Sequence, residues 1–163
     1  MEGTTPVNGN NWTPSVYQAE STVNRKLSEV WPLLLNYEAW NPSFSDAQVS
    51  QIVGDPRSEG GIVLIRKNFK DGTGEPIPEF YAETAKLVQN QQIVWYVYPK
   101  EGQVFRNFVD FRLREVSQGV NFSIHYYAQD RLPRERLIKQ RAEYQQFLND
   151  LAIAFKRYCE THA

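Results

Sequence analysis

Six segments between residues 47 and 130 alternate apolar with polar residues and are joined by short turns. They are AQVSQIV (47–53), GIVLIRKNF (61–69), EFYAETAKLV (79–88), QIVWYVY (92–98), QVFRNFVDFRLREV (103–116) and VNFSIHYYAQ (120–129). A period of two is typical of strands that bury one face, and short turns connect antiparallel neighbours. Because VYQAESTVN (16–24) has the same pattern, the sequence predicts a seven-stranded antiparallel sheet.

The last two strands also have a predictable register. A two-residue loop at Ser117-Gln118 sets Phe111 beside Ile124 and the other apolar residues of these strands on the same face. The alternate residues, His125 among them, then face outward. The sheet is therefore expected to bury one face and leave the other in water.

A long helix is predicted after the sheet, from Pro133 to about residue 161. Its expected buried stripe has alternating spacings of four and three residues and consists of Leu137, Arg141, Tyr144, Leu148, Leu151, Phe155 and Tyr158. At 1.5 Å per residue such a helix is roughly 40 Å long, about the length of a strand of ten to twelve residues. One helix can therefore lie along a whole curved sheet.

Between the first and second strands lies SEVWPLLLNYEAWNP, residues 28–42. Ser28 is predicted as the N-cap of a short helix, with Trp31 and Leu34 on one apolar face. A second short turn is expected to end at Asn41-Pro42, since the residue before proline favours an extended backbone. The segment therefore predicts two short helices separated by a break.

Composition limits the classes of function. We expect one domain over residues 13–163, preceded by a flexible tail at 1–12. The net charge of -1 argues against nucleic acid as a partner. No apolar run is long enough for membrane insertion and no signal peptide is apparent, so a cytoplasmic location is expected. With Cys159 as the one cysteine and two histidines, we expect neither a metal nor a cofactor.

The order of elements resembles the helix-grip fold of the START-like, or SRPBCC, superfamily, which includes polyketide cyclases, birch-pollen-allergen-like proteins and lipid-transfer domains. The resemblance covers about residues 14 to 160. It is carried by SEVWPLLLNYEAWNP, by Gly60-Gly61 before the third strand and by LVQNQQIVWYV. It implies an α+β domain in which a curved sheet wraps around the long C-terminal helix and encloses an apolar cavity, partly closed by the two short helices.

Residues predicted to line such a cavity lie on the expected inner faces. They are Trp40, Tyr81, Trp95, Phe111, Tyr126, Arg141, Tyr144 and Leu148. Broad aromatic surfaces with a few hydrogen-bonding groups suit a small hydrophobic ligand, aromatic or polycyclic.

Glu83 and Arg141 are the charged residues on these faces and the candidates for catalysis. Glu83 is assigned to the same strand face as Tyr81, Ala85 and Leu87. The guanidinium of Arg141 either reaches water, pairs with a carboxylate such as that of Glu83, or binds an acidic group of the ligand.

The resemblance leaves the function open between two classes. A cyclase-like enzyme of natural-product biosynthesis would fold a reactive chain inside the cavity and assist proton transfer. A carrier of a hydrophobic ligand or lipid needs only shape and apolar area. A protein-binding module is a third alternative, and it would need a large exposed apolar patch that the outward residues do not clearly provide. The sequence does not indicate an oligomeric state.

Overall fold

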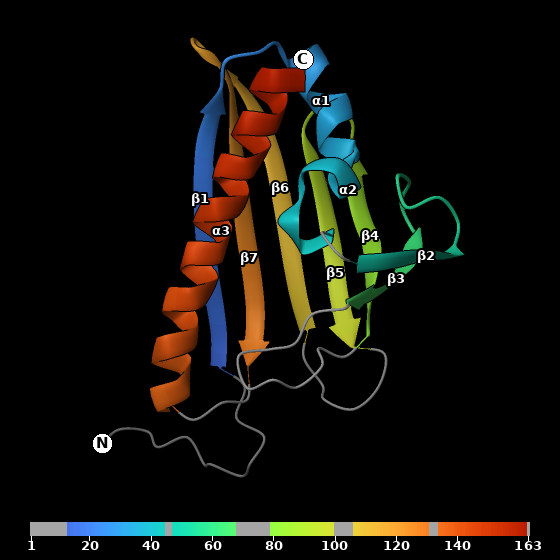
Figure 1. Cartoon of the computed structure of the whole chain (residues 1–163), viewed down its shortest axis with the longest axis vertical. Helices are drawn as coiled ribbons and strands as arrows, with labels where there is room; N and C mark the ends of the chain where they lie inside the picture. Colours follow the sequence, from blue (N-terminus) through green and yellow to red (C-terminus); the bar gives the residue numbers. More distant parts are fainter. Residues whose placement is uncertain (1–12, 45–46, 68–78, 100–105, 131–133, 163) are drawn as a thin grey trace.

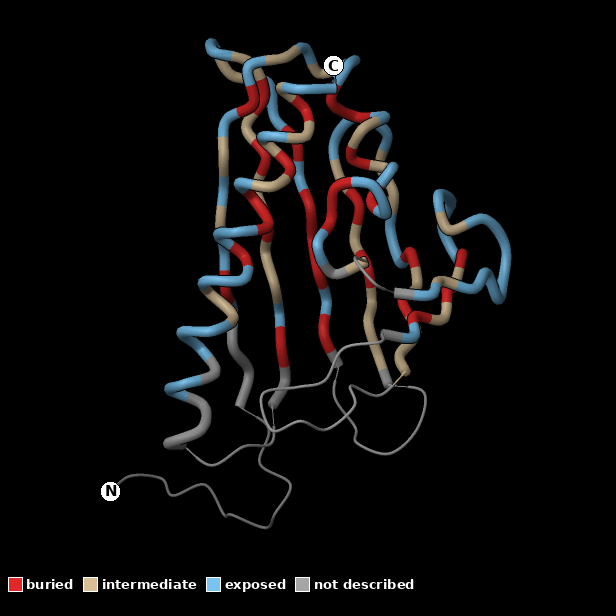
Figure 2. The backbone as a smooth tube through the Cα atoms, in the orientation of Figure 1, coloured by how far each residue is buried: buried red, intermediate tan, exposed pale blue. Residues whose placement is uncertain are grey.

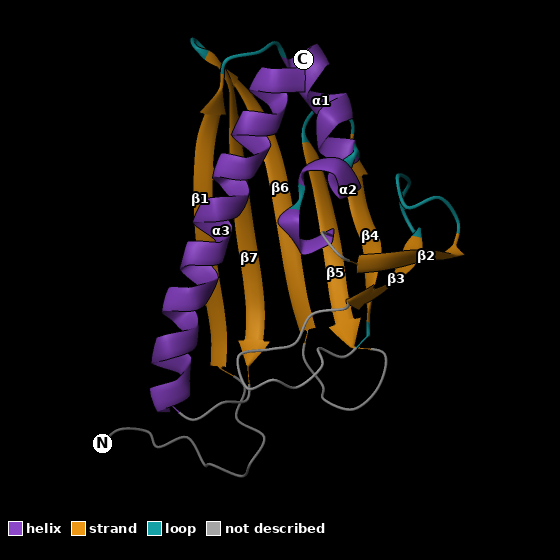
Figure 3. Ribbon diagram, in the orientation of Figure 1, coloured by secondary structure: helices purple, strands orange, loops and turns teal. Residues whose placement is uncertain are grey.

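The computed structural model describes residues 13–44, 47–67, 79–99, 106–130 and 134–162, so the tail expected at 1–12 lies outside the described residues. The described chain forms one curved antiparallel sheet with its helices on one face (Figures 1 and 3). The elements are β1 Thr13–Val23, α1 Leu27–Leu35, α2 Tyr37–Trp40, η1 Pro42–Phe44, β2 Ala47–Val53, β3 Ile62–Lys67, β4 Phe80–Val88, β5 Gln92–Pro99, β6 Arg106–Val116, β7 Gly119–Asp130 and α3 Arg134–His162. The predicted α+β helix-grip arrangement is confirmed.

The sheet has the strand order β1-β7-β6-β5-β4-β3-β2, so the first strand pairs with the last. Residues Ser117 and Gln118 form the turn between β6 and β7, and Phe111 lies opposite Ile124. Both side chains are buried, which confirms the predicted register. His125 lies on the opposite face, as predicted.

The start of α1 differs from the prediction, whereas the exit from α2 agrees with it. α1 begins at Leu27, and its N-cap is Lys26, not Ser28. The Glu29 carboxylate accepts a hydrogen bond from the Lys26 backbone N–H at 3.0 Å, which satisfies a donor at this helix end. After α2, Asn41 has the expected extended backbone, with φ -86° and ψ 116°, and the 3-10 turn η1 then begins at Pro42.

α3 lies against β1, and among its described side chains the buried ones all lie in its second half (Figure 2). Its fully buried residues are Leu148, Leu151, Ala152, Phe155 and Cys159. The Ser21 hydroxyl of β1 donates to the Ala152 carbonyl at 3.0 Å, which ties the helix to the strand. Ile138, one turn from the predicted stripe residue Arg141, is 61% exposed. The helix therefore leaves the core toward its N-terminal end.

Cys159 should be inert in the folded protein. Burial of this α3 side chain, with a smaller contribution from the neighbouring Glu160 carboxylate, raises the pKa of its thiol to about 12. Because the thiolate is the reactive form, we expect a disulfide reagent at about pH 8 to label native protein only as fast as it unfolds. Adding denaturant should accelerate labelling sharply. Rapid stoichiometric labelling of the native chain would contradict this burial.

No helix within the described ranges has the length and apolar character needed to cross a bilayer.

Candidate ligand-binding cavity

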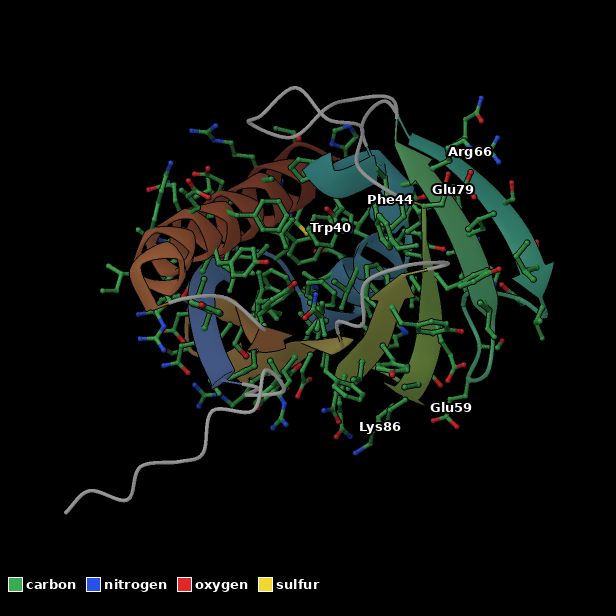
Figure 4. The ribbon with its side chains drawn as sticks, turned by 90° about the horizontal axis from the view of Figure 1, so that it is seen from below. Trp40, Phe44, Glu59, Arg66, Glu79 and Lys86 are labelled. Atoms are coloured by element: carbon green, nitrogen blue, oxygen red, sulfur yellow. The ribbon has the colours of Figure 1, made fainter. Side chains whose placement is uncertain are left out.

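A cavity of about 160 Å³ lies between α3, η1 and the inner face of the sheet. Its described lining residues are Asn41, Phe44, Ile65, Phe80, Ala82, Trp95, Val97, Val109, Phe111, Tyr126, Phe147, Leu148 and Leu151. Nearly all of them are apolar. Figure 4 looks from below into the interior between α3 and the sheet. The site is thus a small apolar chamber at the centre of the fold.

One wall of the cavity has two lining rings, Phe44 and Trp95, and the ring of Tyr37 packs behind them, outside the described lining. Phe44 of η1 lies 4.9 Å from Tyr37 and 5.9 Å from Trp95 between ring centroids, and Tyr37 meets Trp95 edge-on at 4.7 Å. Burial raises the pKa of Tyr37 to about 12, with a smaller contribution from the Glu38 carboxylate. Because each ring is held by the other two, the wall is fixed in position.

Four predicted residues line the cavity: Trp95, Phe111, Tyr126 and Leu148. Tyr144 lies next to it, not among the lining residues, with its ring 5.6 Å from that of Tyr126. The structure therefore brings together residues from β5, β6, β7 and α3, as the sequence predicts. Whether they bind a ligand remains a prediction.

Trp40 belongs to the core and is absent from the described lining. It is 5% exposed, and its ring lies 4.8 Å from Phe155 and 6.0 Å from Phe122. Its indole N–H donates to the Leu34 carbonyl at 3.2 Å, which satisfies an acceptor in the last turn of α1. Trp40 therefore joins α1 and α3 to the sheet, and the cavity wall begins one residue later at Asn41.

Tyr81 and Glu83 lie on the outer face of the sheet, contrary to the prediction. The buried residues of β4 are Ala82 and Thr84. A β-bulge between Thr84 and Lys86 interrupts the alternation of inward and outward side chains. Strict alternation starting from Leu87 therefore assigns Glu83 and Tyr81 to the inner face, which is wrong. Glu83 consequently cannot reach the cavity from its strand.

Arg141 is exposed on α3 and is not among the described lining residues. This position matches the first of the three alternatives, in which the guanidinium reaches water. It also separates Arg141 from Glu83, which points away on the far side of the sheet.

Two buried polar atoms near the cavity lack a hydrogen-bond partner within the described part of the chain: the Tyr17 hydroxyl and the Asn107 side-chain oxygen. Tyr17 is 6% exposed and pairs across β1 and β7 with the lining residue Tyr126. Asn107 is 7% exposed and lies two residues before the lining residue Val109, on the same face of β6. An unpaired buried polar group costs free energy, so these atoms favour a polar group nearby.

Sequence reasoning missed several lining residues: Asn41, Phe44, Ile65, Phe80, Ala82, Val97, Val109, Phe147 and Leu151. Most are ordinary inner-face residues of the predicted strands, so alternation places them inward but does not tell a cavity wall from a filled core. Phe44 had a usable signal, because it is the first large apolar residue after the Asn41-Pro42 break. The described residues include no group of His, Cys, Asp and Glu side chains that could hold a metal ion.

No protein-family model matches the chain, and no curated protein sequence matches it. Solved structures do. Ara h 8.0201 aligns with a TM-score of 0.63 and 11% identity over 92% of this chain and all of its own length. Protein SA2116 of unknown function from Staphylococcus aureus aligns with a TM-score of 0.62 and 11% identity, over 92% of this chain and 96% of that one.

DynU16, described as a putative protein in the dynemicin biosynthetic locus, aligns with a TM-score of 0.59 and 15% identity over 90% of this chain. This chain spans 47% of DynU16. Likeness at such low identity concerns the fold. Together with the seven-stranded sheet, the long C-terminal helix and the two short helices after β1, it shows that the chain has a helix-grip fold.

Proposed function

We propose that the chain binds one small hydrophobic molecule, about the size of a single substituted ring, in the cavity beneath α3. The observation that carries this proposal is the volume of about 160 Å³ together with its apolar lining. A dry cavity of about 150 Å³ with aliphatic and aromatic walls accepts benzene, whereas drug-sized ligands need about 300 Å³ or more. A polycyclic ligand would require the cavity to widen.

A hydroxyl substituent on the ring would suit the unpaired atoms next to the cavity. Tyr17 can donate or accept through its hydroxyl, and the Asn107 amide presents an acceptor or, if its orientation is reversed, a donor. A ligand hydroxyl both donates and accepts, so it can satisfy either group. We therefore expect phenols to bind better than the corresponding hydrocarbons.

Carriage or sensing of the ligand fits the site better than catalysis does. None of the described lining residues is a carboxylic acid, a histidine, a lysine or an arginine. A cyclase-like reaction needs a group that transfers a proton within hydrogen-bond reach of the substrate. The two earlier candidates, Glu83 and Arg141, lie on the outer face and on the exposed part of α3.

Toluene, p-cresol and anthraquinone test the proposal by calorimetry and thermal unfolding. A ligand that binds only the folded state stabilises it, by about 2.7 kcal/mol at one hundred times its Kd. We expect p-cresol to raise the melting temperature most, toluene less and anthraquinone least. No shift with either single-ring compound at about 1 mM would refute binding in this cavity.

Ala82→Leu should separate the cavity from nonspecific binding. The larger side chain fills space at the β4 wall, so the affinity for both single-ring compounds should fall at least about tenfold. Arg141→Met is the matched control, because Arg141 is exposed and lies outside the described lining. Its affinity for p-cresol should stay unchanged. Equal losses in the two variants would place the ligand elsewhere.

Tyr17→Phe tests the hydroxyl preference alone. Since the Tyr17 hydroxyl has no described partner, its removal should cost little or no stability. The affinity for p-cresol should fall roughly five- to tenfold while that for toluene is kept. Equal changes in affinity for p-cresol and toluene would reject the hydroxyl preference. They would not contradict binding in the cavity.

A further inference from the structure

The outer face of the sheet carries a band of large apolar side chains across five neighbouring strands. We call it the outer aromatic band, and it consists of Val16, Tyr81, Tyr96, Tyr98, Phe108 and Tyr127. Strand register makes it continuous: Val16 lies opposite Tyr127, Tyr127 opposite Phe108, and Phe108 opposite Tyr96. The exposed apolar patch that a protein-binding surface requires is therefore present, although the sequence pattern did not reveal it.

The exposure of this band is high for such residues. Val16 is 63% exposed, Phe108 41% and Tyr127 40%, and the three remaining tyrosines are half-buried. With about 200 Å² per fully exposed aromatic side chain, the band offers on the order of 350 Å². Two copies facing each other would bury about twice that apolar area. Because protein interfaces are about three-fifths non-polar, the total would be a little over the roughly 1,000 Å² that a weak specific dimer needs.

The orientation of the rings indicates what kind of surface can cover the band. Tyr96 stacks on Phe108 at 4.8 Å and 24°, and Tyr96 and Tyr98 lie 5.0 Å apart at 34°. These contacts cover part of the ring faces of Tyr96, Tyr98 and Phe108. A nucleotide base stacks on an open aromatic face, and the contacts among Tyr96, Tyr98 and Phe108 leave less of such a face free. A protein surface can pack against edges and hydroxyls.

The charges beside the band are balanced within the chain. Asp110 is 5% exposed and accepts hydrogen bonds from Gln92 at 2.9 Å and from the Arg112 guanidinium at 2.9 and 3.0 Å. Glu83 and Lys86 on β4 add one charge of each sign. Two identical surfaces repel each other when they carry a large net charge. The charges beside the outer aromatic band nearly cancel, so two copies can approach each other through it.

We propose that the outer aromatic band is the contact face of a homodimer, covered by the same band of a second copy of this chain. A two-fold interface uses one patch on both subunits, so it needs a surface that is apolar and balanced in charge. The proposal is independent of the cavity, which opens on the other face of the sheet. It implies a dimer of modest affinity, because the area lies at the lower limit for stable association.

Sedimentation velocity and light scattering from about 1 to 200 µM test the proposal on the full chain. We expect the wild-type chain to shift from monomer to dimer across this range. Phe108→Glu should raise the dimer Kd at least tenfold and leave the circular dichroism spectrum and p-cresol binding unchanged. Val16→Glu, at a more exposed position, should do the same if Phe108→Glu impairs folding.

Ile138→Glu is the matched control, since Ile138 is 61% exposed on α3, away from the band. This variant should dimerise like the wild type. A wild-type chain that stays monomeric throughout the range would overturn the proposal, including the case in which a different protein covers the band. Dimerisation that persists in both Phe108→Glu and Val16→Glu would overturn it as well.

Discussion

Trp40→Ala should lower the free energy of unfolding by about 3 to 5 kcal/mol, the usual cost of removing a large buried aromatic side chain. Trp40 is 5% exposed and its ring contacts those of Phe111, Phe122 and Phe155, so truncation leaves a void where α1, α3 and the sheet meet. Urea unfolding followed by far-ultraviolet circular dichroism measures the loss without relying on tryptophan fluorescence.

Trp40→Phe separates the hydrogen bond from the packing. It keeps most of the ring contacts but leaves the Leu34 carbonyl without its indole donor, which should cost about 1 to 3 kcal/mol. Because Trp40 is not among the described lining residues, p-cresol affinity should be unchanged in Trp40→Phe. A marked loss of affinity at preserved stability would show that Trp40 faces the ligand after all.

Gly61→Ala should destabilise the chain by about 3 kcal/mol or more, at the upper end for adding a methyl group to a packed site. A Cβ at Gly61 would lie 2.1 Å from the Asp55 carbonyl oxygen and 2.8 Å from the Pro56 Cα. Both are backbone atoms, so the turn over residues 55–58 must move. That movement strains the hydrogen bond from the Thr84 N–H to the Gly61 carbonyl at 2.9 Å, which attaches this turn to β4.

Gly60→Ala is the adjacent control. Gly60 has a φ of +85°, but a Cβ there meets no atom within 4 Å. The change therefore incurs only the backbone cost of a left-handed residue, about 1 to 2 kcal/mol. Chemical denaturation of both variants should rank Gly61→Ala as the more damaging. The reverse order would mean that the backbone angle of Gly60 matters more for stability than the close approach at Gly61.

The sequence predicted best where two independent patterns had to agree. The register of β6 and β7 followed from alternation on both strands plus a two-residue turn, and only one pairing puts Phe111 and Ile124 on the same face. The position of β1 beside β7 did not follow, because alternation says nothing about which distant strand a given strand will join.

Prediction failed where a local irregularity broke the period. A single bulge in β4 reversed the assignment of Tyr81 and Glu83, and no residue in EFYAETAKLV marks it. On α3 the spacing identified a stripe but not its end. The buried part begins near Leu148, so Arg141 lies on the exposed part of the helix. The helical period predicts which side of α3 faces the sheet. Burial also depends on how far the sheet extends along the helix, which the period does not give.

The pairing of β1 with β7 governs how the protein can be made. Thr13 lies opposite Asp130, and α3 packs mainly on β1. During synthesis β1 therefore cannot form its strand pairing until β7, the last strand of the sheet, has been translated. Until then β7 or its predecessors present an open strand edge, and the inner face lacks its helix. Such distant pairing also slows folding. Closure of the domain is thus a late event, in which the earliest and latest parts of the chain come together last.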